Sequence, residues 1–149
     1  MRAALGGHMK YIAAPLELSL ARTTGAPGLA RAALADWLAE RTHDEPTHDD
    51  AGLLVTELVS NCVRHARIEA KRPLRLRAWL RGTTLRIELW DAGTDGAIAP
   101  GPPRLADDAG TGGFGLNLVA LLSSDWGVQR DAHGTTVWLE LSTAPGATA

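Results

Sequence analysis

Apolar and polar residues alternate in three short segments of the chain, with the period of a half-buried β-strand. They are residues 16–20, 74–80 and 85–90, and residues 126–130 and 135–141 form two further predicted strands, which resemble a closing hairpin. The second and third segments flank a turn at residues 81–84, and the last two flank a turn at residues 131–134, so each pair predicts an antiparallel hairpin. In the first hairpin one face is apolar and the other carries Arg and Glu, which predicts a sheet covered on one side only.

Three other segments carry apolar residues at helical spacing. They are residues 29–41, residues 47–66 and residues 115–124, and residues 42–48 form a polar connection before the second. Thr47 is the expected N-cap of the second helix, because acidic residues follow it in the first turn. The five tryptophans lie on apolar faces or at strand ends and are expected to be mainly core: Trp37, Trp79, Trp90, Trp126 and Trp138.

Composition limits the classes of protein that fit this pattern. At 149 residues the chain is long enough for one domain with an adequate core. A net charge of −2 argues against a broad nucleic-acid-binding surface, and a single cysteine, Cys62, excludes a disulfide framework. No apolar run approaches the ~20 residues that a membrane span needs, and the first nine residues lack the apolar core of a signal peptide. The cytoplasm is the simplest compartment for such a chain.

Two polar residues, Glu57 and Asn61, interrupt the apolar run of the second helix. They are four residues apart, about one helical turn, so their side chains lie on one face. A carboxylate and an amide beside a core are costly to bury unless a partner satisfies them. A bound metal and phosphate would do so, because an amide oxygen is a hard ligand for Mg²⁺ and a carboxylate can act as a base. The simpler alternatives are a surface Glu and a solvent-facing or capping Asn.

The stretch from Asp91 to Gly113 is rich in Gly and Pro. It holds six of the 16 glycines and three of the eight prolines, and a loop this long inside a compact domain is usually functional or disordered. It begins with Asp91 and Gly93 just beyond a strand. It ends at Gly113 and Gly115, which open a helix whose free N–H groups favour phosphate. An Asp that starts a turn, and glycines that serve only a tight turn, are the simpler alternatives.

Three motifs in a fixed order resemble a known family. They are Glu-x-x-x-Asn on a helix (Glu57, Asn61), Asp-x-Gly at the end of a strand (Asp91, Gly93), and Gly-x-Gly-Leu opening a helix (Gly113, Gly115, Leu116). This order resembles the Bergerat-fold (GHKL) ATP-binding domain shared by gyrase-type ATPases and sensor histidine kinases. Residues 57–66 and 113–119 are similar to the N-box and the second glycine box of the bacterial anti-sigma-factor serine/threonine kinases. The likeness covers roughly residues 16–141.

The resemblance implies a site for ATP and Mg²⁺. Asp91 would accept a hydrogen bond from the adenine amino group, and the glycine box would hold phosphate. Glu57 would be the catalytic base, and Asn61 would be the metal ligand. The implied cofactor-binding residues are Asn61, His65, Asp91, Gly93, Gly113, Phe114, Gly115, Leu116 and Thr135, with residues 94–112 as a candidate lid. An ordinary strand residue is an equal alternative for Thr135, as is a structural or solvated His for His65.

The resemblance also implies the fold class and the domain limits. We expect an α/β protein of the α+β two-layer sandwich type, with a mostly antiparallel sheet and helices on one face. The ATP-binding domain would span residues 15–142, after an N-terminal extension of residues 1–14 and before a flexible tail of residues 143–149.

The function implied by the resemblance is that of an ATP-binding regulatory protein. It would be an anti-sigma-factor-like serine/threonine kinase that binds a sigma factor and phosphorylates an anti-anti-sigma protein. Direct nucleic-acid and membrane contacts are not expected, and a homodimer is one expectation because relatives often dimerise. One alternative is a nucleotide-binding regulatory module with little or no phosphotransfer. Another is a histidine-kinase-like catalytic domain that acts in trans.

Overall fold

The structure is a computed structural model, and it describes residues 14–64, 72–92 and 113–143. In chain order the elements are β1 (Leu16–Leu20), α2 (Ala26–Ala39), α3 (Glu45–Arg64), β2 (Leu74–Arg81), β3 (Thr84–Asp91), α4 (Gly113–Leu122), β4 (Asp125–Asp131) and β5 (Gly134–Ser142). The predictions for His65, Gly93, the lid at residues 94–112, and most of the N-terminal extension and the tail lie outside the described residues. So do the side chains of residues 113–116.

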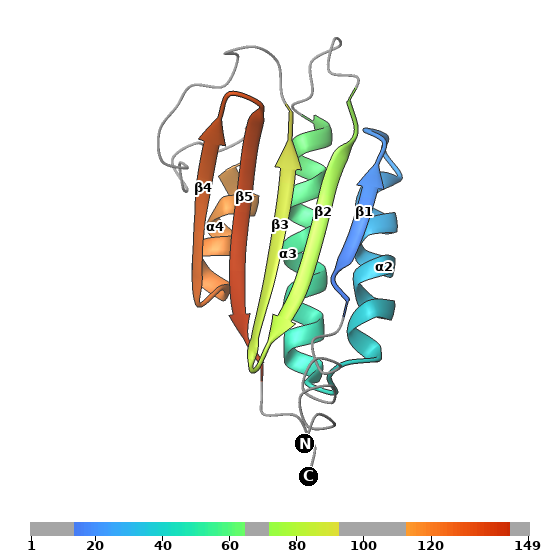
Figure 1. Ribbon diagram of the computed structural model, residues 1–149, viewed down its shortest axis with the longest axis vertical. Helices are drawn as coiled ribbons and strands as arrows, with labels where there is room; N and C mark the ends of the chain where they lie inside the picture. Colours follow the sequence, from blue (N-terminus) through green and yellow to red (C-terminus); the bar gives the residue numbers. More distant parts are fainter. Residues whose placement is uncertain (1–13, 65–71, 93–112, 144–149) are drawn as a thin grey trace, which may run out of the picture.

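Among the described residues, one antiparallel sheet forms the front layer and three helices form the back layer (Figure 1). The strand order is β1-β2-β3-β5-β4, and every neighbouring pair is antiparallel. The two predicted hairpins are β2–β3 and β4–β5, and a two-residue turn with Gly82 at φ 59° joins the first. Glycine at a positive φ suits the twist of such a turn. The predicted two-layer α+β sandwich is therefore confirmed.

The core lies between the sheet and the helices. Alternate strand residues point toward the helices and are buried, as in Leu74, Leu76 and Ala78 of β2 and in Leu85, Ile87 and Leu89 of β3. Helix α3 meets them with a buried stripe that includes Leu54, Val55, Leu58 and Val59. Each fully buried Leu or Ile stabilises the fold by roughly 1.5–3 kcal/mol relative to exposure. This core fixes the positions of the strand ends and of α3.

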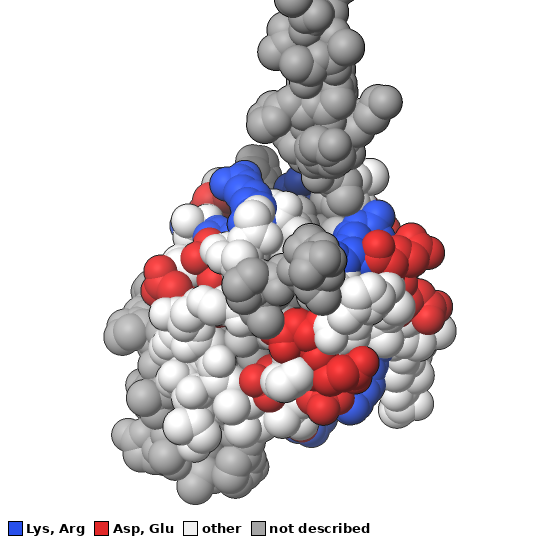
Figure 2. Space-filling view, turned by 90° about the horizontal axis from the view of Figure 1, so that it is seen from below, with Lys and Arg blue, Asp and Glu red and all other residues white. Residues whose placement is uncertain are grey.

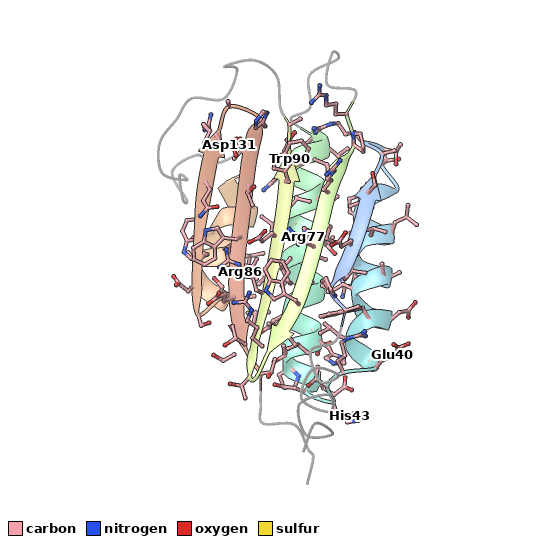
Figure 3. All side chains as sticks on the ribbon, in the orientation of Figure 1. Glu40, His43, Arg77, Arg86, Trp90 and Asp131 are labelled. Carbon is pink, nitrogen blue, oxygen red and sulfur yellow. The ribbon has the colours of Figure 1, made fainter. Side chains whose placement is uncertain are left out.

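The opposite face of the sheet carries charged and aromatic residues, including three of the five tryptophans. Arg75 lies over Trp90, Arg77 over Trp79 and Arg86 over Trp138, at 5.5, 5.2 and 4.2 Å from the ring centroids. Figure 3 labels Arg77, Arg86 and Trp90 on this face. The expectation that the tryptophans are mainly core is wrong, because strand alternation sets these three opposite the buried leucines. Trp37 belongs to the buried core, and the partly buried Trp126 packs against it.

Arg86 holds two carboxylates on this open face. Its guanidinium lies 2.9 Å from Oε2 of Glu88 on its own strand and 3.1 Å from Oε2 of Glu140 on β5. Burial alone would lower the pKa of Arg86, but the hydrogen bonds to Glu140 and Glu88 outweigh it, so the pKa is raised. The open face is therefore stabilised by a cross-strand ion network far from the helices.

Helix α3 begins earlier than the sequence pattern predicted. The helix starts at Glu45, and the Asp44 carboxylate accepts the Thr47 backbone N–H at 3.4 Å and the Thr47 hydroxyl at 2.7 Å. Asp44 is thus the capping residue and Thr47 lies in the first turn, which corrects the expected N-cap. Pro46 fits there because the first turn needs no donor from its nitrogen. Acidic side chains are visible at this end of the molecule (Figure 2), and Glu45 in the first turn of α3 complements the helix dipole.

Candidate functional site

The carboxylate of Asp91 lies at the end of the sheet where β3 stops and β5 begins. Asp91 has the same parity as the buried Leu85, Ile87 and Leu89, so its side chain points to the helix layer. Its cross-strand partner is Thr135, on the same face of β5. Directly opposite residues of this kind have Cβ atoms about 4.5–5.5 Å apart. The structure therefore brings two of the predicted adenine-side residues together.

Helix α3 reaches the same end through Cys62. Burial, and then the negative charge of Asp91 together with a side-chain hydrogen bond to it, raise the pKa of the Cys62 thiol to about 12. The thiol is therefore protonated at neutral pH. Its interaction with the carboxylate means that the last turn of α3, which carries Asn61, lies beside Asp91.

Arg22 is the main partner of Asp91, and it comes from the loop after β1. The guanidinium nitrogen Nη2 donates to Oδ1 of Asp91, and Nη1 lies 3.5 Å from Oδ2. The side chains are only 7% and 17% exposed, so this is a largely buried ion pair. The Nε atom of Arg22 donates to the carbonyl of Arg72 at 2.9 Å. Sequence analysis missed Arg22, because its partner lies 69 residues away and no local pattern links the two.

Glu57 and Asn61 lie on the side of α3 that faces away from α2. Gly52 marks the side that faces α2, since a Cβ there would be 3.3 Å from Nε of Arg31. Asn61 follows Gly52 by nine residues, about two and a half turns, and so lies on the opposite side. In Figure 1, α3 stands between α2 and α4, so this opposite side is the side of α4. Both Glu57 and Asn61 are half-buried.

The N-terminus of α4 lies at the same end of the molecule as Asp91. The chain leaves α4 and enters β4 at Asp125, where Ser124 donates to the carbonyl of Glu140 at 2.8 Å. This is the far end of β5 from Thr135, so α4 ends there and begins about 15 Å away, toward Asp91. Figure 1 shows this direction of α4. The first free N–H groups of α4, from Gly113 onward, therefore lie at the end of the molecule predicted to hold phosphate.

Gly134 gives the strand ends room to approach each other. A Cβ at this position would lie 2.4 Å from the carbonyl oxygen of Asp91 and 2.9 Å from Cα of Ala92. The Asp131 carboxylate accepts the N–H groups of His133 and Gly134 at 2.7 and 3.1 Å, which fixes the turn before Gly134. The backbone that carries Asp91 is thus packed directly against the start of β5.

The described residues limit how a metal ion could be held at this end of the molecule. Among them no group of three or more His, Cys, Asp or Glu side chains could hold a metal ion. Mg²⁺ commonly takes one or two protein oxygens and completes its shell with phosphate and water. The carboxamide of Asn61 offers one such oxygen, although Oδ1 accepts a hydrogen bond from Arg64 in this structure. No described helix has the length and apolar character to cross a membrane.

Comparisons with known proteins agree with this arrangement. The sequence model of the histidine kinase-like ATPase domain matches residues 21–141. A structure of the RsbU and RsbW domains of Rv1364c from Mycobacterium tuberculosis is 26% identical, with a TM-score of 0.69 over 90% of this chain. The blue-light activated histidine kinase of Erythrobacter litoralis EL346 is 25% identical, with a TM-score of 0.50 over 66% of this chain. The chain covers only 34% and 31% of these two structures. No curated protein matches the chain significantly.

Proposed function

The chain belongs to the histidine kinase-like ATPase domain family, and from that premise we propose that it is an anti-sigma-type serine/threonine kinase. It would bind a sigma factor and transfer the γ-phosphoryl group of ATP to a serine of an anti-anti-sigma protein. The observation that carries the proposal is the gathering of Asp91, Thr135, the last turns of α3 and the N-terminus of α4 at one end of the sandwich. The similarity to a structure that contains an RsbW domain supports the kinase class.

Asp91 supplies adenine recognition in this proposal. Its carboxylate offers only acceptors, which match the exocyclic amino group of adenine. Thr135, its cross-strand partner, has a hydroxyl that can complete the same hydrogen-bond network through water. Because Asp91 points into the helix layer, the base would lie against the core side of the sheet, behind β3 and β5.

The phosphate groups would lie between α3 and the start of α4. The free N–H groups and the dipole of α4 favour negative charge, and Gly113 and Gly115 let the backbone approach. Asn61 would hold Mg²⁺, which neutralises charge on the transferred group when it is bound. In this placement Mg²⁺ would take the place of Arg64 as the partner of Oδ1 of Asn61.

Glu57 would act as the base. One turn before Asn61 on the same side of α3, its carboxylate can accept the proton of the attacking serine hydroxyl. The serine oxygen forms the new bond to the γ-phosphorus, the bond from that phosphorus to the bridging oxygen breaks, and ADP leaves. Positioning of the two oxygens in line with the phosphorus provides most of the acceleration.

The kinase proposal is tested by transfer of labelled phosphate from ATP to a cognate anti-anti-sigma protein. Wild type should form acid-stable phosphoserine. Glu57→Gln should keep ATP binding but lose transfer by about 10²-fold or more, the typical contribution of a positioned base. Glu17→Gln is the matched control, because Glu17 lies on the open face of β1 and should leave transfer unchanged. Absence of transfer by wild type, with partner binding established, would refute the kinase.

A second candidate function is a nucleotide-binding regulatory module with little phosphotransfer. The hydrogen bond from Arg64 to Oδ1 of Asn61 favours it, because that bond competes with a metal for the same oxygen. Under this hypothesis Glu57→Gln leaves regulation of the partner intact. An acid-labile phosphohistidine product would instead indicate a histidine-kinase-like domain acting in trans.

A further inference from the structure

The Arg22–Asp91 ion pair is a buried feature of the site that the proposed roles leave unexplained. Arg22 lies two residues beyond the end of β1, yet its guanidinium reaches Asp91 at the end of β3, across the start of β2. Its side chain is 7% exposed. Burying a cation to this degree costs several kcal/mol unless it is paired and hydrogen-bonded. The carboxylate that offsets this cost is Asp91, the residue assigned to adenine.

The geometry of the pair restrains the Asp91 side chain. A guanidinium is a rigid fork, and here its two terminal nitrogens address the two different oxygens of the carboxylate. A third nitrogen, Nε, is tied to the carbonyl of Arg72 at 2.9 Å, so the fork itself is anchored to the backbone before β2. Rotation of the Asp91 carboxylate about its last torsion would break both contacts. Arg22 therefore fixes the direction in which Asp91 presents its oxygens.

The Asp91 carboxylate can accept hydrogen bonds from Arg22 and from an adenine base at the same time. The two oxygens of a carboxylate have about four acceptor positions in total. Arg22 and the Cys62 thiol contact the carboxylate from the protein side. Each oxygen has more than one acceptor position, so these contacts do not by themselves prevent a hydrogen bond from a ligand.

We propose that Arg22 is a positioning residue that sets the selectivity of this site for an adenine base. The proposal rests on the proposed nucleotide site. An adenine amino group donates to a fixed Asp91 oxygen, whereas the carbonyl of hypoxanthine at the same position is an acceptor and is repelled. Without Arg22 the Asp91 carboxylate can turn away, so the hydrogen bond from the adenine amino group weakens. The repulsion of the hypoxanthine carbonyl also falls. Both the ATP affinity and the preference for ATP should then decrease.

The test is calorimetric titration of the full chain with ATP and with inosine triphosphate, each with Mg²⁺. Wild type should prefer ATP. Arg22→Met, which keeps the length but removes the charge and the fork, should lower ATP affinity about tenfold or more, in line with one lost charge-assisted hydrogen bond. Inosine triphosphate affinity should change by less than about twofold, so the ratio falls. Arg22→Lys keeps the charge but not the planar guanidinium. Its ratio of ATP to inosine triphosphate affinity should lie between those of wild type and Arg22→Met.

Arg86→Met is the matched control. Arg86 is also a partly buried arginine with two carboxylate partners, but it lies on the open face of the sheet, so its loss should leave the ratio unchanged. If Arg22→Met does not fold, as judged by near-ultraviolet circular dichroism, Arg22→Lys alone decides. An unchanged ratio, or tighter ATP binding, in the folded Arg22 variants would overturn the positioning role and leave the nucleotide site intact. Absence of ATP binding by wild type would overturn both.

Discussion

Gly134→Ala is expected to damage both stability and nucleotide binding, because a methyl group has no room at this position. The added Cβ would lie 2.4 Å from the carbonyl oxygen of Asp91, 2.9 Å from Cα of Ala92 and 3.0 Å from Nε1 of Trp90. The first two neighbours are backbone atoms, which cannot move aside by a change of rotamer. The start of β5 must therefore separate from the end of β3, and Asp91 moves with it.

The size of the effect follows from the cost of overpacking. Inserting a methyl group into a closely packed position typically costs about 1–3 kcal/mol. For a chain of 149 residues, each kcal/mol lowers Tm by roughly 3–4 °C, so the expected fall is about 3–12 °C. A shift of Asp91 that loses one hydrogen bond to adenine should weaken ATP binding about tenfold.

Thermal unfolding and calorimetric titration of two control variants separate the two effects. Gly82→Ala should also destabilise, by about 1–2 kcal/mol, because Gly82 has a φ of 59°, but nothing lies within 4 Å of its Cβ and the turn is at the other end of β3. Its ATP affinity should match wild type. Gly28→Ala, exposed in α2 with nothing within 4 Å, should be neutral or stabilising by up to ~1 kcal/mol. If Gly134→Ala had the same Tm and the same ATP affinity as wild type, the claim that a methyl group has no room at this position would be refuted.

Four further predictions concern the site, the open face of the sheet and the core. The pKa of Cys62 is raised from 9.0 to about 12, so the stability that the neutral thiol contributes is fully present below pH 9.0 and is lost as pH rises toward 12; Cys62→Ala should flatten this part of the unfolding profile. Alkylation of Cys62 at pH 8 should be slower than that of a free thiol, because less thiolate is present, and equal rates would contradict the raised pKa. Arg86→Met should lower the free energy of unfolding by about 1 kcal/mol in a urea titration, and no loss would mean that the open-face network is only solvated charge. Leu76→Ala, at a fully buried position, should cost about 2–5 kcal/mol in the same titration, and a cost below 1 kcal/mol would contradict its place in the core.

Strand alternation predicted three of the five described strands, β1, β2 and β3, because a sheet with one covered face leaves a period of two in the sequence. The closing hairpin β4–β5 was predicted instead from two segments that flank the turn at residues 131–134. The same period was misapplied to the tryptophans. Trp79, Trp90 and Trp138 have the opposite parity to the buried leucines, and arginines stack on them instead. The expectation relied on the apolar character of tryptophan and not on its position in the strand.

The sequence predicted the start of α3 less well than the strands, and it gave no sign of the long-range pair between Arg22 and Asp91. Thr47 was predicted as the N-cap of α3 because it precedes two acids, but Asp44 provides the oxygen and Pro46 continues the first turn. The candidate polar residues of the site were predicted from the order of the motifs. Arg22 could not be found in this way, because the sheet order alone brings it to Asp91. What marks Arg22 as part of the site is that its charged side chain is buried, and this is visible only in the folded chain.

The central claim is that the end of the sandwich at Asp91 binds ATP through the adenine base. Calorimetric titration of wild type and Asp91→Asn with ATP and Mg²⁺ tests it most directly, because the amide keeps the shape of the carboxylate but is a poorer acceptor. We predict saturable binding to wild type and affinity at least tenfold weaker in the variant, with unfolding of both measured as a check on the fold. No binding to wild type, or equal affinity in the two proteins, would contradict the assignment of this site.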